Sequence, residues 1–184
     1  MAITTFAAID IGSYEVSMKI FELSKKIGFR QLNDVRYRLE IGKGAYSSGR
    51  LEPEIVDSIC MILNDFSKMM KEFGVSDYRA CATSAFREMI NPLIVQEQIY
   101  CRTGIRVEIL SNAEQHFLGY KSIAAKEAGF KKMIQKGTAI LDVGGGGLQV
   151  SLFDKDTLVT TQSLKMGSCL LYTSPSPRDG LLSR

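Results

Sequence analysis

Apolar and polar residues alternate with a period of two near the start of this chain. The run Phe6–Ile11 is almost wholly apolar, and in Val16–Phe21 every second residue is apolar. The stretch Leu32–Ile41 alternates less regularly. Because a period of two is typical of strands that bury one face, the pattern predicts two strands joined in a hairpin, with a third, outer strand beside them.

A helical period follows from Pro53, a residue that suits the first turn of a helix. Apolar residues then recur at steps of three and four until Gly74, and they are Ile55, Ile59, Ile62, Leu63, Phe66, Met69, Met70 and Phe73. This pattern predicts one long helix. The preceding segment, Gly42–Arg50, is rich in glycine and serine and carries two cations. We interpret it as a connector, and the alternative is the border of an anion site.

Short strands and helices alternate in the middle of the chain. Tyr78–Ala82 and Val107–Leu110 predict strands. Between them, Asn91 followed by Pro92 predicts the start of a helix that ends at Gly104.

The next helix has a clear start signal. Ser111 and Glu114 have the spacing of a capping box, which predicts a helix running to about Ala128. Gly129–Gly137 contains three lysines and is predicted to be a solvated linker. From Thr138 the pattern of strand, loop and strand begins again.

The segment Ala139–Gly145 repeats the order of residues in Ala7–Ser13. In both, an apolar run leads to Asp-x-Gly, at Asp10 in the first copy and Asp142 in the second. The ungapped match continues through the pairs Met18/Val150, Ile20/Leu152, Phe21/Phe153 and Glu22/Asp154. Two copies of one unit imply two related half-domains facing one cleft.

The repeat suggests how the chain is organised. We expect a first α/β lobe over residues 1–129, the start of a second lobe over residues 130–168, and a tail over residues 169–184. The tail clusters proline with serine and has no period, so we interpret it as non-native and exclude it from the fold. The second lobe is then incomplete, and the apolar face formed by Leu141, Val150, Leu152 and Leu158 is expected to be partly bare.

Composition excludes several classes of protein. The chain has 184 residues, 45% hydrophobic and 23% charged, which is ordinary for a globular protein. A net charge of +3 is too small to predict nucleic-acid binding. The sequence shows neither a signal peptide nor a membrane span, so we expect a cytoplasmic protein that does not bind membranes. The cysteines lack C-x-x-C spacing, and Cys60, Cys81 and Cys101 are expected to be buried free thiols.

The two Asp-x-Gly loops are the main candidates for chemistry. Glycines let a backbone turn sharply so that its amides can face phosphate oxygens, while an aspartate can hold a hydrated Mg²⁺. Two ordinary turns with capping aspartates are the alternative, but a purely structural turn has no reason to repeat its carboxylate. His116 is the single histidine and has no cysteine near it. We expect it to be structural.

The loops, together with Ala82–Glu88 and Val107–Ser111 leading to Glu114, resemble the exopolyphosphatase/guanosine pentaphosphatase (Ppx/GppA) family. The resemblance covers about residues 5–168. It implies an α/β, actin-like (ribonuclease-H-like) duplicated ATPase-type fold, with the first lobe complete and the second truncated. It also implies polyphosphate or pppGpp as the partner, held between two lobes, Mg²⁺ as the cofactor, and a homodimer as one option for the full-length protein. By this similarity phosphate is bound by Gly12, Ser13, Tyr14, Arg87, Gly144, Gly145 and Gly146, the metal by Asp10 and Asp142, and the catalytic positions are Glu114, Gln115 and Gln149.

Three departures from the family pattern bear on activity. Tyr14 stands where the family usually has asparagine, and Gly147–Gln149 replaces its Ser-Thr-Glu. The glutamate expected to activate water falls on Gln115, and an amide cannot take a proton. Glu114 does not substitute for it, because one residue is a rotation of about 100° around a helix. The family implies hydrolysis of a terminal phosphoanhydride, and the alternative is a pseudo-enzyme that senses polyphosphate or nucleotides.

Overall fold

The chain divides after Leu110 into two compact units, Met1–Leu110 and Ser111–Arg184. The computed structural model describes residues 3–26 and 28–173. The helix that follows Leu110 belongs to the second unit in this division, whereas we placed it in a lobe ending at residue 129. The lobe boundaries themselves stay a prediction.

The first unit is built around a five-stranded sheet with strand order β3-β2-β1-β4-β5. The strands β1, β2 and β3 pair antiparallel, and β1, β4 and β5 pair parallel. The elements in chain order are β1 (Thr4–Ile11), β2 (Glu15–Ser24), β3 (Gly28–Arg38), α1 (Ile41–Ser48), α2 (Pro53–Glu72), β4 (Asp77–Ala82), α3 (Ser84–Glu88), α4 (Pro92–Thr103) and β5 (Val107–Ile109). The predicted hairpin, the outer strand and the long helix are confirmed.

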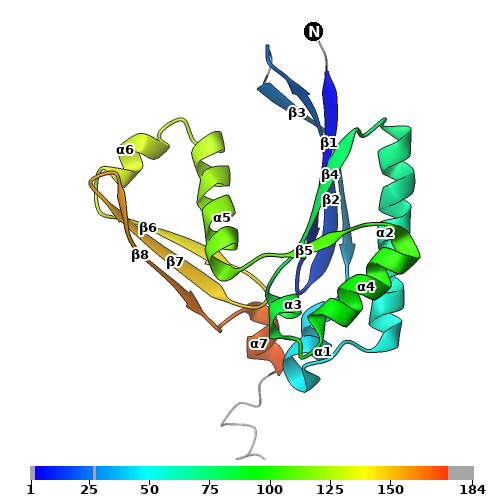
Figure 1. Cartoon of the computed structure of the whole chain (residues 1–184). Helices are drawn as coiled ribbons and strands as arrows, with labels where there is room; N and C mark the ends of the chain where they lie inside the picture. Colours follow the sequence, from blue (N-terminus) through cyan, green and yellow to red (C-terminus); the bar gives the residue numbers. More distant parts are fainter. Residues whose placement is uncertain (1–2, 27, 174–184) are drawn as a thin grey trace, which may run out of the picture. The chain divides into compact units, whose positions relative to one another are not determined.

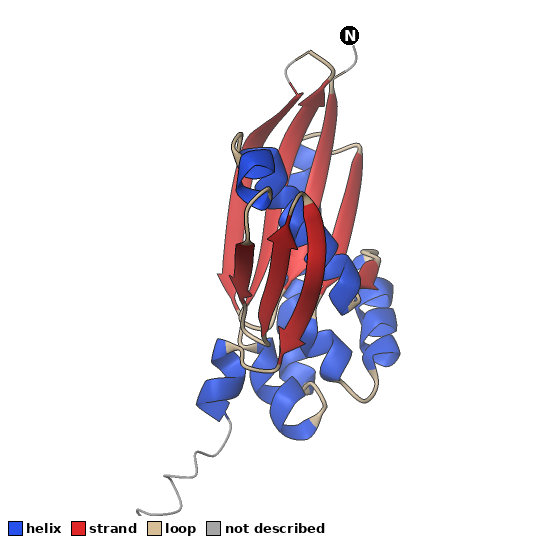
Figure 2. Cartoon of the chain, turned by 90° about the vertical axis from the view of Figure 1, so that its left-hand side faces the viewer, coloured by secondary structure: helices blue, strands red, loops and turns tan. Residues whose placement is uncertain are grey.

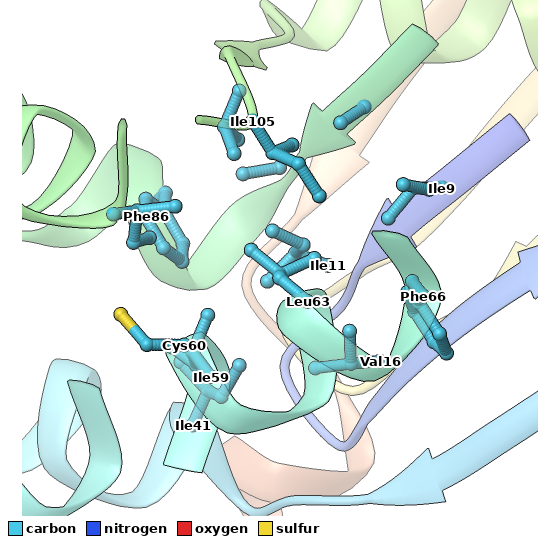
Figure 3. Close-up of a cluster of buried hydrophobic side chains, with 14 of the residues drawn as sticks. Ile9, Ile11, Val16, Ile41, Ile59, Cys60, Leu63, Phe66, Phe86 and Ile105 are labelled. Atoms are coloured by element: carbon cyan, nitrogen blue, oxygen red, sulfur yellow. The ribbon is translucent and has the colours of Figure 1, made fainter. Parts of the chain in front are cut away.

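One face of this sheet packs against α2 and α4 (Figure 1). Side chains from β1 and β2, such as Ile9, Ile11 and Val16, meet Leu63 and Phe66 of α2, and all five are buried (Figure 3). Burial of a side chain of this size stabilises the fold by about 1.5–3 kcal/mol. The loops that follow these strands are therefore anchored to a closely packed core.

The second unit contains a three-stranded antiparallel sheet with order β6-β7-β8. Its strands are labelled in Figure 1, and Figure 2 draws all strands of the chain in red. The elements of this unit are α5 (Asn112–Lys126), α6 (Phe130–Ile134), β6 (Thr138–Val143), β7 (Leu148–Asp154), β8 (Thr157–Leu164) and α7 (Ser168–Thr173). The helix α5 packs on one face, where the Tyr120 ring lies 6.1 Å from the Phe153 ring. On the other face Leu141 is 63% exposed and Val143 is 71% exposed. Of the residues predicted to form a bare apolar face, Leu141 and Leu152 are exposed on this side and Val150 is partly buried, whereas Leu158 pairs with Phe153 on the face that α5 covers.

Two segments that we interpreted as loops are helical. The predicted connector Gly42–Arg50 lies mostly within α1, because Ile41 and Ala45, one turn apart, are both buried in the core. The predicted linker Gly129–Gly137 contains α6, because Phe130 is buried and its ring lies 6.1 Å from that of Phe153. In both cases burial of apolar side chains outweighs a polar or glycine-rich composition.

Several smaller expectations need correction. Asn91 stands at the first position before α4, but its side chain accepts no capping hydrogen bond. Cys60 is buried as expected, whereas Cys101 is exposed because it lies on the outer side of α4. The tail was excluded from the fold, yet Ser168–Thr173 form α7, and residues 174–184 lie outside the described residues. No helix in the described ranges is long and apolar enough to cross a membrane.

Candidate phosphate site

The first Asp-x-Gly loop is a tight turn at the carboxyl end of β1. The Gly12 amide donates a 2.9 Å hydrogen bond to the Glu15 carbonyl oxygen, which closes the hairpin between β1 and β2. Asp10 is paired with Ser17 on β2 and Cys81 on β4, and its side chain lies on the sheet face opposite to the core. Because β4 and β5 run parallel to β1, their carboxyl ends meet at this same edge. Ligands of α/β proteins commonly bind at such an edge.

Ser13 is held from three directions. Its side chain is only 4% exposed, and its Oγ lies 2.6 Å from the Tyr46 hydroxyl and 2.9 Å from the Ser84 Oγ. Its carbonyl oxygen accepts a 2.8 Å hydrogen bond from the Gly42 amide. The structure thus packs α1, through Tyr46 and Gly42, against the predicted phosphate loop. Sequence reasoning missed this, although the spacing of Ile41 and Ala45 is a weak sign of a helix.

Tyr14 is the outer residue of the same turn. It is 41% exposed, and the guanidinium of Arg38 lies 4.7 Å from the centre of its ring. Such a cation–π contact contributes about 0.5–1 kcal/mol at an exposed position. The residue that departs from the family pattern therefore points toward solvent, beside a cation.

Arg87 lies on α3, next to the carboxyl end of β5. Its Nη1 donates a 2.7 Å hydrogen bond to the Leu110 carbonyl oxygen. Burial lowers the pKa of Arg87, while the neighbouring Tyr46 and Glu88 act to raise it. Arginine stays protonated in proteins, so a half-buried positive charge is fixed at the edge where the first loop also ends.

The second Asp-x-Gly loop has the same turn as the first. The Gly144 amide donates a 2.9 Å hydrogen bond to the Gly147 carbonyl oxygen, as Gly12 does to Glu15. Asp142 pairs with Gln149 as Asp10 pairs with Ser17. The pairing of the next two strands, β2 with β3 and β7 with β8, also shifts register at equivalent places. The shift lies between Ile20 and Phe21 in the first unit and between Leu152 and Phe153 in the second. The sequence repeat is therefore a repeat of backbone geometry.

The glycine loop after Asp142 contacts α7. The Ser168 amide donates to the Gly144 carbonyl oxygen at 3.1 Å, and the Cys169 amide donates to that of Gly145 at 2.9 Å. Gly146 is buried. A Cβ added at Gly167 would lie 2.2 Å from the Gly145 oxygen, so only glycine fits there. Residues 169–173, which we predicted to belong to a non-native tail, are therefore part of the helix that supports this loop.

Asp142 and Gln149 line a cavity of about 220 Å³ in the second unit. It lies between α5 and the strands β6 and β7, and His116, Tyr120 and Ser151 also line it. His116 is bonded to hydroxyl groups, with its Nδ1 2.9 Å from the Thr161 Oγ1 and its Nε2 2.9 Å from the Ser163 Oγ. These contacts join α5 to the sheet.

The start of α5 carries Glu114 and Gln115. The capping box is present, since the Ser111 amide donates to the Glu114 carboxylate at 2.8 Å and the Glu114 amide donates to the Ser111 Oγ at 3.2 Å. Glu114 thus serves the helix start. The Gln115 Oε1 is buried and has no hydrogen-bond partner among the residues that the structure describes. An unsatisfied buried acceptor is costly, and it marks a place where a donor such as water belongs.

Each loop carries one aspartate, a type of ligand that Mg²⁺ prefers. Within residues 3–26 and 28–173, no group of three or more His, Cys, Asp or Glu side chains could hold a metal without help. Mg²⁺ is usually bound by one or two carboxylates together with water and phosphate oxygens. A single aspartate at each loop, Asp10 or Asp142, is consistent with that chemistry.

Comparison with known proteins decides the family. A model of the Ppx/GppA phosphatase family matches residues 20–183. The chain belongs to the Ppx/GppA phosphatase family. Exopolyphosphatase 2 of Mycobacterium tuberculosis is 25% identical over 185 residues, covering 94% of this chain and 55% of that protein. The guanosine-5'-triphosphate,3'-diphosphate pyrophosphatase of Photobacterium profundum is 23% identical over 179 residues, covering 97% of this chain and 34% of that protein.

The solved structure of an exopolyphosphatase from Cytophaga hutchinsonii has the same fold. It superposes with a TM-score of 0.78 at 22% identity, over 92% of this chain and 53% of the other. The Ppx/GppA chain described here is therefore α/β and actin-like, as the resemblance implied. It spans about half the length of the curated exopolyphosphatases that it matches.

Proposed function

We propose that the protein is a Mg²⁺-dependent phosphohydrolase that removes the terminal phosphate of polyphosphate or pppGpp. The observation that carries this proposal is the repeated hairpin, in which Asp10 and Asp142 precede turns with the same hydrogen bond. Its membership of the Ppx/GppA family supports the same chemistry.

Several groups of this chain fit the binding of phosphate. Gly12 and Gly144 carry no side chain that would keep a phosphate away from the backbone. Arg87 supplies a fixed positive charge, which counters the charge that develops on the transferred group. Asp10 and Asp142 would hold Mg²⁺, which when bound neutralises phosphate oxygens and supplies Lewis-acid assistance.

Gln115 would orient the attacking water. Its buried Oε1 is an acceptor without a partner in the described part of the chain, so a water can donate a hydrogen bond to it. In GTPases a glutamine orients the attacking water in this way without removing its proton. Loss of a general base lowers a rate by about 10²–10⁴-fold. We therefore expect slow hydrolysis, with positioning and electrostatics supplying the remaining catalysis.

A protein that binds phosphate without hydrolysing it is the second candidate, and the amide at Gln115 favours it. Gln115 and Gln149 both carry amides where the family resemblance places carboxylates. A protein that kept its loops and Arg87 but lost these acids would bind polyphosphate or nucleotide without turnover. Such a pseudo-enzyme would act as a sensor.

Phosphate release from long-chain polyphosphate tests the proposal. The protein is incubated with Mg²⁺ and polyphosphate, pppGpp or ATP, and inorganic phosphate is measured. We expect slow release from polyphosphate or pppGpp that stops when Mg²⁺ is chelated. Binding without release from any substrate would support the sensor, and absence of both would reject the phosphate site.

A further inference from the structure

Tyr46 connects two parts of the first unit that sequence reasoning treated separately. It lies on α1, which we expected to be a connector, and its hydroxyl lies 2.6 Å from the Oγ of Ser13. A phenol is a stronger acid than an alkyl hydroxyl, so Tyr46 is the better donor of this pair. Ser13 is buried, and a buried hydroxyl that loses its partner is costly.

The backbone of α1 holds the same residue. The Gly42 amide donates to the Ser13 carbonyl oxygen at 2.8 Å. A Cβ at Gly42 would lie 3.1 Å from the Ser13 Cβ and 2.7 Å from the Tyr46 Cε2. The helix therefore bonds to Ser13 at its carbonyl oxygen and at its Oγ, and side-chain rotation at Ser13 would break the second of these bonds.

Tyr46 also lies near the predicted phosphate-binding cation, Arg87. Although burial lowers the pKa of Arg87, the phenol group of Tyr46 acts in the opposite direction. Tyr46 thus lies near Arg87 as well as Ser13.

We propose that Tyr46 is a positioning residue, which fixes the first phosphate loop by holding the Ser13 hydroxyl. The proposal rests on the proposed function, because it assumes that this loop binds phosphate. Tyr46 acts through Ser13 and does not itself contact the substrate. Its removal should therefore change ligand affinity only while the Ser13 hydroxyl is present.

A double-mutant cycle tests this dependence. Binding of tripolyphosphate with Mg²⁺ is measured by calorimetry for the wild type, Tyr46→Phe, Ser13→Ala and the double variant. We expect Tyr46→Phe to weaken binding by about tenfold, the equivalent of one lost hydrogen bond. In the Ser13→Ala background, Tyr46→Phe should weaken binding no further. Equal weakening in both backgrounds would show a general structural role and overturn the proposal, as would unchanged binding by Tyr46→Phe.

Two further variants keep the experiment decisive. Tyr78→Phe is the matched control, because its hydroxyl accepts a hydrogen bond from the Arg106 amide and has no recorded contact with the loop. It should bind as the wild type does. Gly42→Ala places a methyl group against both the Tyr46 ring and Ser13, so it should also weaken binding and serves as the second variant if Tyr46→Phe fails to fold. If the wild type itself does not bind tripolyphosphate, the proposed function fails and this proposal falls with it, whereas binding without coupling overturns only the role of Tyr46.

Discussion

The Nη1 of Arg87 donates a 2.7 Å hydrogen bond to the carbonyl oxygen of Leu110, and this bond joins α3 to the carboxyl end of β5. Leu110 is buried, so its carbonyl oxygen depends on protein donors. The guanidinium thus has a structural task in addition to its predicted contact with phosphate.

Replacing this arginine should lower stability as well as binding. We expect Arg87→Met to reduce the free energy of unfolding by about 1.5–3 kcal/mol, since a charged hydrogen bond is lost. Arg102→Met is the control, because Arg102 forms an exposed ion pair with Asp57 at 2.7 Å that contributes at most about 1 kcal/mol. Urea denaturation measures both variants. Equal losses would mean that the bond to Leu110 contributes no more than a surface pair.

The two aspartates should account for ligand-induced stabilisation. Polyphosphate with Mg²⁺ at a hundredfold excess over Kd should stabilise the protein by about 2.7 kcal/mol. Thermal unfolding of the variant Asp10→Ala with Asp142→Ala should show no such shift, because the carboxylates that hold the metal are gone. Asp65→Ala, on the exposed side of α2, should retain the shift. A full shift in the double variant would reject the assignment of both loops.

Restoring a carboxylate at Gln115 should raise phosphate release by at least about tenfold. Partial burial raises the pKa of such a carboxyl, so the rate should increase with pH as the group ionises. The KM should change little, because the new group acts on water. Gln98→Glu, which is exposed on α4, serves as the control. Adding Gln149→Glu should raise the rate further, although neighbouring groups need not act additively.

A flat rate in Gln115→Glu would decide between the two candidate functions. If that variant folds and binds polyphosphate without faster release, the enzyme interpretation should be given up for the sensor.

The bare apolar face of the second sheet should cause self-association of the 184-residue chain. Leu141 and Val143 expose more than half of their surface, and β6 is an edge strand. Sedimentation at increasing concentration should show oligomers of the wild type and fewer oligomers when both residues are replaced by lysine. Met61→Lys, an equally exposed change on α2, should have no effect. A monomeric wild type with one cooperative melt would contradict this prediction.

Two truncated chains should distinguish the contribution of α7 to stability from that of the residues after it. A chain ending at Thr173 should unfold like the wild type. A chain ending at Ser168 loses the bond from the Cys169 amide to Gly145, so it should be less stable by about 0.5–1.5 kcal/mol. Calorimetry of the two chains makes the comparison. A loss in the longer chain would show that residues 174–184 contribute to the fold.

Residue periodicity predicted the elements that bury a regular face, but not those that depend on distant contacts. The alternation at Val16–Phe21 was sufficient to predict β2, because each apolar residue meets the core directly. Glycines at positions 42 and 44 argued against a helix by intrinsic propensity. Contacts with Ser13, far away in the sequence, make Gly42 necessary, and no local pattern contains that information.

The candidate site was predictable to a similar extent. The repeat of Asp10 at Asp142 predicted equivalent turns, and the structure has them. The burial of Ser13 and its bond to Tyr46 were not predictable, since they depend on how α1 packs.

The capping box at the start of α5 also bears on how such a site can evolve. Glu114 is held by Ser111, so its exchange would loosen the helix, whereas the Oε1 of Gln115 forms no bond with the described residues. Codons for glutamine and glutamate differ only in their first base. A lineage of these proteins can therefore lose or regain the acid at this position by point mutation, while the helix that carries it keeps its start.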